Sequence, residues 1–217
     1  RWKHPEEGYL SPAYFIPIFE QNGTCVELDY FVYEQVCRTI RNWMDTGRPV
    51  VPVSVNVSRW SLYNDDLEKN ILQIVDKYHL PHEYIEFEIT ESAFVLETAL
   101  ISDFTSKLRE KGFRVLIDDF GSGYSSLNSL KDIMVDVLKI DIKFLPVKEG
   151  EVKAPIILSA VIDMAQKLGL DIIAEGVETQ EQKGLLETLG CENVQGFYYY
   201  RPMPIAEFEK LIVGQEE

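Results

Sequence analysis

The sequence contains little cysteine, and few positive charges for its acidic content. Its three cysteines, Cys25, Cys37 and Cys191, are too few and odd in number for a disulfide framework. None of them has metal-ligand spacing, which excludes a cysteine-ligated zinc site. Lys and Arg total 21 against 36 Asp and Glu, and this net charge of −15 argues against binding to nucleic-acid polymers or membrane surfaces. No apolar run approaches the length of a membrane span, and nothing at the start is typical of a signal peptide. We therefore predict a reduced, cytoplasmic protein without direct membrane contact.

The 217 residues, of which 46% are hydrophobic, are enough for one globular domain with a sizeable core. The sequence has no internal repeat, low-complexity linker or second domain, so we predict a single domain over residues 1–217. The chain begins with Arg1 rather than Met. We therefore expect a piece excised from a longer protein, with any membrane anchor or sensor outside the given residues.

Strand-like runs alternate with helical patterns along the chain. Such alternation predicts a parallel sheet built through right-handed crossovers. An open doubly wound sheet would concentrate ligands at one switch point, whereas here nearly every strand ends on a polar residue. We therefore expect an α/β fold of the (β/α)8 barrel type, with its first strand upstream of Arg1. The expected strands are 51–57, 84–90, 113–117, 135–140, 170–174 and 193–194, and the expected helices include 14–19, 31–43, 67–78, 100–108, 157–168 and 205–213.

The polar strand ends would meet at one end of such a barrel, where active sites lie. Their side chains are rich in oxygen, and neither histidine nor cysteine is among them. Oxygen ligands favour Mg²⁺ or Mn²⁺ over zinc. Two such ions close together are suited to splitting a phosphodiester. The residues at these strand ends are Asn56, Glu88, Asp118, Asp119, Lys139, Glu175 and Gln195.

An acidic pair, Asp118-Asp119, directly follows the run 113–117. Strand alternation points Asp118 toward the barrel interior, while Asp119 leans aside at the tip. Two adjacent carboxylates with different directions can serve two cations, and Gly121 lets the backbone turn close to a ligand. The alternative is an acidic turn that caps a helix beginning at Ser125.

Two further acids, Glu86 and Glu88, share one face of the run 84–90. Burying both is costly without cations or partners. A surface edge strand would avoid that cost, but Ile85, Phe87 and Ile89 make the opposite face apolar, which favours an interior position for the acids.

Lys139 is also expected to point inward, with Asp141 two residues later. It could pair with carboxylates, act on a water or a phosphate, or form a Schiff base. Glu91 lies just past its strand, and Glu178 would reach back toward Glu175.

Taken in order, these motifs resemble the EAL-domain family of cyclic di-GMP phosphodiesterases over essentially the whole chain. Each motif alone is weak, but their order and spacing are specific. The resemblance rests on Arg1-Trp2, His4-Pro5, Phe15–Pro17, Ser54–Ser58, Glu88–Ser92, Asp118–Leu127, Leu138–Asp141, Ala174–Glu178, Gln195–Phe197 and Arg201–Pro204.

The resemblance implies a modified TIM (β/α)8 barrel with one antiparallel strand, and hydrolysis of cyclic di-GMP to linear 5′-pGpG with two divalent cations, Mg²⁺ or Mn²⁺. Lys139 would orient the attacking water, and Glu91 would hold the segment after Asp119. Arg1 would contact a substrate phosphate, and Asp141, Glu178 and Gln195 would also take part in binding the substrate. The implied ligands are Asn56, Glu88 and Asp118 for the first metal and Asp118, Asp119 and Glu175 for the second, with Glu178 and Gln195 as supporting polar contacts.

The family also has a further first-metal ligand, the Glu of a Glu-Ala-Leu motif, which falls before Arg1. Activity is therefore expected if the parent protein carries that Glu. The resemblance further implies a homodimer and companion sensor or GGDEF-type domains. Two alternatives remain: a catalytically inactive EAL domain that serves as a cyclic di-GMP receptor, and a barrel lyase that uses Lys139 as an imine-forming nucleophile.

Overall fold

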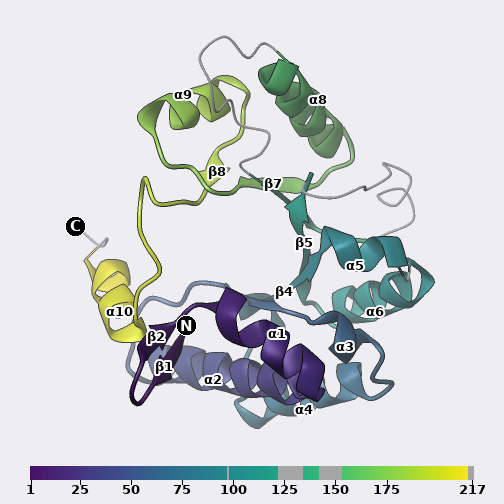
Figure 1. The fold of residues 1–217 in the computed structure, drawn as a ribbon, viewed down its shortest axis with the longest axis vertical. Helices are drawn as coiled ribbons and strands as arrows, with labels where there is room; N and C mark the ends of the chain where they lie inside the picture. The colour runs from purple at the N-terminus through teal and green to yellow at the C-terminus, as the bar shows by residue number, and fades with distance from the viewer. Residues whose placement is uncertain (97, 122–133, 142–152, 215–217) are drawn as a thin grey trace.

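The computed structural model describes residues 1–96, 98–121, 134–141 and 153–214, without the side chains of 94–96 (Figure 1). The expected helix from Ser125 lies outside the described residues, and so does the charged stretch 146–151, which its sequence predicts to be a solvated connection. Six strands pair in sequence order in one wholly parallel sheet. This order lacks the reversal of a doubly wound sheet. The strands are β3 (Val53–Asn56), β4 (Ile85–Thr90), β5 (Arg114–Phe120), β6 (Val137–Ile140), β7 (Asp171–Ala174) and β8 (Asn193–Val194).

All six expected strands are thus confirmed. The sheet curls into part of a barrel with the helices outside it, and this agrees with the modified (β/α)8 class (Figure 1). Antiparallel pairing among the described residues occurs in a separate hairpin of β1 (Trp2–His4) and β2 (Gly8–Leu10). This hairpin could not be predicted from the sequence, because three-residue strands carry no periodic signal.

The expected helices are present as well, several of them longer than their apolar stripes. Thr179 and Gln182 form a capping box at the start of one helix, and Gly169, at φ 73°, lies just after the end of another. Among the described residues, no helix is both long and apolar enough to cross a bilayer. The helices are α1 (Pro12–Asn22), α2 (Cys25–Asp45), α3 (Arg59–Leu62), α4 (Leu67–Lys77), α5 (Glu91–Leu96), α6 (Thr98–Glu110), α8 (Lys153–Lys167), α9 (Gln180–Thr188) and α10 (Ile205–Val213), with a 3₁₀ turn at His82–Tyr84.

The two faces of the sheet differ in chemistry. On β4, Ile85, Phe87 and Ile89 are at most 2% exposed and belong to the main apolar core with the covering helices. The alternate residues Glu86 and Glu88 point the other way, into the barrel, because successive strand side chains point to opposite faces. The fold is therefore held together outside the sheet and leaves its inner face for polar groups. The three cysteines are free and buried, as the sequence predicts.

Candidate metal centre

The sheet register brings the polar strand ends together. Asn56 on β3 lies directly opposite Glu88 on β4, and Asp118 on β5 lies opposite Thr90 of the same β4. Lys139 lies one strand further, on β6, and Glu175 follows the last residue of β7. Parallel strands in one curled sheet thus present all these side chains at the same edge.

Lys139 lies between an acid on β4, an acid on β5 and a third acid just after β7. Its Nζ is 2.8 Å from Glu88 Oε1, 2.8 Å from Asp118 Oδ1 and 2.7 Å from Glu175 Oε1. The residue is only 5% exposed. Burial acts to lower the pKa of Lys139, but the charges of Glu88, Glu175 and Asp118 outweigh it, so the pKa is raised. A firmly protonated amine is a poor nucleophile, and this argues against the imine-forming lyase.

Glu175 carries the most perturbed carboxyl of the site. Burial raises its pKa to about 7; the charge of Lys139 opposes this rise and the charge of Asp118 adds to it. Gln195, just after β8, donates a hydrogen bond from Nε2 to Glu175 Oε1. The site therefore contains more negative charge than Lys139 alone can offset.

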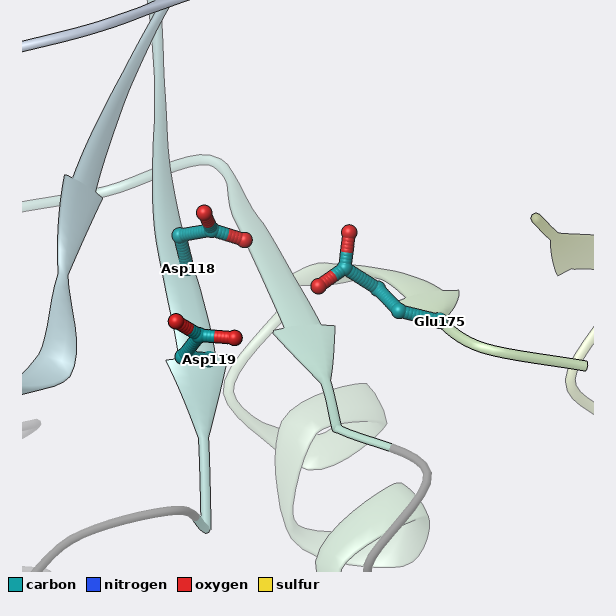
Figure 2. A group of neighbouring side chains, drawn as sticks. All are labelled: Asp118, Asp119 and Glu175. Carbon is teal, nitrogen blue, oxygen red and sulfur yellow. The ribbon is translucent and has the colours of Figure 1, made fainter. Parts of the chain in front are cut away.

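Asp118 and Asp119 face Glu175 across the mouth of the barrel (Figure 2). One carboxylate oxygen from each of the three residues lies within 4.8 Å of the others, close enough to share a cation. A register irregularity between Ile117 and Phe120 interrupts the pairing of β5 with β6, and Asp119 has a left-handed backbone at φ 57°. Such a bulge re-aims side chains. It brings Asp119 into the group, although simple alternation would turn it away from Asp118.

Glu91 lies behind this acidic group at the start of α5. It is 2% exposed, and its Oε2 accepts a hydrogen bond of 2.7 Å from the backbone N of Gly121. Gly121 comes two residues after Asp119, so Glu91 fixes the backbone on which the acidic pair is carried.

The remaining predicted residues lie around the edge of the site. Asp141 is half-buried, and its backbone N donates to Phe120 O at 3.3 Å. Glu178 has an exposed side chain, and its backbone N donates to Gln182 Oε1 at 2.7 Å within the capping box. Arg1 is exposed and lines a cavity of about 1130 Å³ that also reaches Asn56.

Sequence reasoning missed the partner of Glu86. Arg114 NH1 lies 3.0 Å from Glu86 Oε1, and its NH2 contacts Asp171 on β7. The alternative of a surface edge strand fails, since β4 is paired on both sides. Arg114 shares a strand face with Asp118, so alternation along β5 could have identified it. These ion pairs thus lie near the starts of the strands, at the opposite end of the barrel from the acidic mouth, where Arg114 and Asp171 are partly exposed.

The match to known proteins agrees with this arrangement. The model of the family described as "EAL domain" matches residues 1–202. The chain belongs to the EAL-domain family. Cyclic di-GMP phosphodiesterase NbdA of Pseudomonas aeruginosa is 36% identical over 215 residues, which are 98% of this chain and 27% of that protein. Bifunctional diguanylate cyclase/cyclic di-GMP phosphodiesterase MucR of the same organism is 34% identical over 204 residues, 94% of this chain and 30% of that protein.

A solved structure of PaMucR phosphodiesterase in complex with c-di-GMP superposes on this EAL domain with a TM-score of 0.89. It is 34% identical, and the match covers 96% of this chain and 84% of that one. The chain therefore spans less than a third of the length of the two curated relatives, although it covers most of the solved EAL structure.

Proposed function

We propose that this EAL domain is a metal-dependent phosphodiesterase that hydrolyses cyclic di-GMP to linear 5′-pGpG. The main support is the contact of Lys139 with Glu88, Asp118 and Glu175, which gathers acids from three strands around one buried ammonium. Relatives named cyclic di-GMP phosphodiesterase, and a related structure in complex with c-di-GMP, give the substrate class.

The charges and donor atoms of the site fit divalent cations. Three carboxylates contact Lys139, and a fourth, that of Asp119, lies near two of them. The raised pKa of Glu175 reflects burial together with repulsion from Asp118. All the donor atoms are oxygens, which suits Mg²⁺ or Mn²⁺. When bound, such ions supply an activated water and stabilise negative charge on a phosphodiester. The proposed ligands are Asn56, Glu88 and Asp118 for one ion and Asp118, Asp119 and Glu175 for the other.

The other residues would hold the reacting groups in place. Lys139 would donate from Nζ to the attacking water and so fix its direction, and Glu175 would accept from that Nζ. Glu91 would hold the Gly121 backbone and thereby Asp119. Arg1 lines the cavity next to Asn56 and would bind a substrate phosphate. The proposed supporting contacts come from Asp141, Glu178 and Gln195.

The domain is proposed to work within a larger protein. We propose a single EAL unit over residues 1–217, in a cytoplasmic setting, with sensor or GGDEF-type domains in the same parent chain. The relative MucR, which is named a bifunctional cyclase and phosphodiesterase, supports a companion domain of the opposite activity. A homodimer is proposed from family membership.

The proposal is tested by hydrolysis with the full-length protein. Cyclic di-GMP and Mn²⁺ are added, and linear 5′-pGpG is measured by chromatography. Asp118→Asn should abolish product because it removes a ligand common to both ions. The matched control is Asp103→Asn, which changes a side chain that is 61% exposed and paired with Lys107 on α6.

Absence of product at every Mn²⁺ and Mg²⁺ concentration would refute the proposed phosphodiesterase activity. Calorimetry then separates the remaining possibilities. Metal-independent binding of cyclic di-GMP without turnover would identify a receptor, whereas no binding would reject cyclic di-GMP as the ligand.

A further inference from the structure

The end of β3, which carries Asn56, is held from outside the sheet by α2. Tyr33 on α2 donates a hydrogen bond of 3.1 Å from its hydroxyl to the backbone O of Asn56. Asp29 on the same helix accepts two hydrogen bonds at Oδ2, from Ser58 N at 2.9 Å and from Ser61 Oγ at 2.6 Å. Helix α2 therefore contacts the chain on both sides of the Asn56–Val57 bond.

The two α2 side chains have little freedom to move. Asp29 and Tyr33 are four residues apart and so lie on one face of the helix. Tyr33 is 3% exposed, and its ring packs edge-on against Phe87 of β4 at a centroid distance of 5.6 Å. Burial raises the pKa of Asp29, while hydrogen bonds from Ser61 and Ser58 act to lower it. Both side chains are thus inserted between the helix and the sheet.

A third contact fixes the same point from the neighbouring strand. Val57 N donates to the backbone O of Glu88 at 2.8 Å, so the backbone after Asn56 is tied to β4 as well as to α2. The direction of the Asn56 side chain depends on the backbone at this point. A small rotation here would turn the Asn56 side chain relative to Glu88, which lies opposite it in the register of the sheet.

We infer that Tyr33 and Asp29 are positioning residues for Asn56, and through it for the metal centre. The inference rests on the proposed function only in taking Asn56 as a ligand. Partners that orient a ligand from behind typically contribute about 10- to 100-fold to metal affinity. The hydroxyl of Tyr33 is expected to act in this way although it lies outside the mouth of the barrel.

Tyr33→Phe tests the inference, since it removes only the hydroxyl and keeps the buried ring. Tyr30→Phe is the matched control, because Tyr30 lies on the same helix as Tyr33 but its hydroxyl accepts hydrogen bonds from Asn64 at 3.1 Å and Asn70 at 3.0 Å, away from Asn56. Calorimetry with Mn²⁺ should show about tenfold weaker binding for Tyr33→Phe and less than about twofold change for Tyr30→Phe. Asp29→Ala should also weaken binding, and Asp29→Asn, which keeps an acceptor oxygen, should restore it.

Amide hydrogen exchange of residues 54–61 gives a readout that is independent of metal and of activity. Exchange in this segment should be faster in Tyr33→Phe than in Tyr30→Phe. Equal exchange in the two variants, or equal Mn²⁺ affinity when the wild type binds Mn²⁺, would overturn the inference. A wild type that binds no Mn²⁺ and hydrolyses nothing would refute the proposed function, and the exchange comparison would still decide whether Tyr33 holds the end of β3.

Discussion

Lys139 Nζ and Glu175 Oε1 lie 2.7 Å apart, although the two residues come from β6 and from the connection after β7. The same oxygen also accepts a hydrogen bond from Gln195 Nε2. One carboxylate oxygen therefore connects residues on, or directly after, the three consecutive strands β6, β7 and β8. Any change to this contact should affect both the stability of the metal-free site and its affinity for cations.

Replacing Lys139 by Met should separate these two effects. The variant leaves Glu88, Asp118 and Glu175 without their buried counter-charge, so the metal-free protein should lose about 3–5 kcal/mol of stability. A divalent cation can replace the lost charge, so Mn²⁺ should raise the melting temperature of the variant more than that of the wild type. Hydrolysis should fall by at least about 10²-fold.

Thermal unfolding with and without MnCl₂ measures both effects of this substitution. Lys69→Met is the control, because Lys69 pairs with Asp66 on the surface and its side chain is 67% exposed; it should change stability by less than about 0.5 kcal/mol. If Lys139→Met melts like the wild type without metal, the buried ammonium does not stabilise the site.

Stability should depend on pH through Asp29. Burial raises its folded-state pKa above the ordinary value, so the folded chain holds this proton more tightly than the unfolded chain does. The stabilisation is complete below the ordinary pKa of about 3.9 and is lost as pH rises through the raised value. Asp29→Asn has no proton to release at this position, so its stability relative to wild type should increase as pH rises from about 3.9. Urea unfolding at stepped pH measures the difference; a constant difference would contradict the prediction.

Gly196→Ala should disrupt the support of Glu175. A Cβ at Gly196 would lie 2.1 Å from Val177 O and 2.3 Å from Val177 N, both backbone atoms in the segment just after Glu175. The two segments must then separate, which should cost about 1–3 kcal/mol and move Gln195 away from Glu175. Gly184→Ala is the control: a Cβ at this position within α9 meets nothing within 4 Å, and it should stabilise by about 0.5–1 kcal/mol. Urea unfolding would disprove the clash if both variants were equally stable.

The thiols should be unreactive in the folded protein. Burial raises the pKa of Cys37 to about 12, and it also raises the pKa values of Cys25 and Cys191. Very little thiolate is therefore present at pH 8. Ellman's reagent should detect no thiol until urea is added, and then all three. Rapid reaction of one equivalent in buffer would mean that one of these sites opens readily.

Much of the fold could be predicted because the spacing of apolar residues along the sequence matches the helices and strands of the structure. α10 has the predicted bounds Ile205–Val213, and β7 differs from its predicted run by one residue. Apolar spacing identifies such elements because each packs one face against a continuous core. The hairpin of β1 and β2 was missed because each strand contributes only three residues.

The site could be predicted in its members but not in its contacts. Alternation identified Lys139 and the acids as inward residues, yet the three ion pairs of Lys139 depend on the register of separate strands. The position of Asp119 depends on a bulge, and bulges leave no periodic trace. The hydrogen bond from Tyr33 to Asn56 spans 23 residues of sequence, beyond the reach of any local pattern.

The inner face of the sheet carries charged side chains at two levels, with the apolar side chains of Leu116 and Val137 between them, and its outer face is apolar. Cohesion and chemistry are therefore carried by opposite sides of the same strands. Exchanging the charged set for apolar side chains as a whole should leave a folded but chemically inactive scaffold, since the desolvation cost of partly buried ionised groups can exceed what their pairing returns. Removing one charged residue at a time should cost more stability, because it leaves its partner unpaired. A substitution away from the reacting residues can therefore abolish activity by destabilising the barrel.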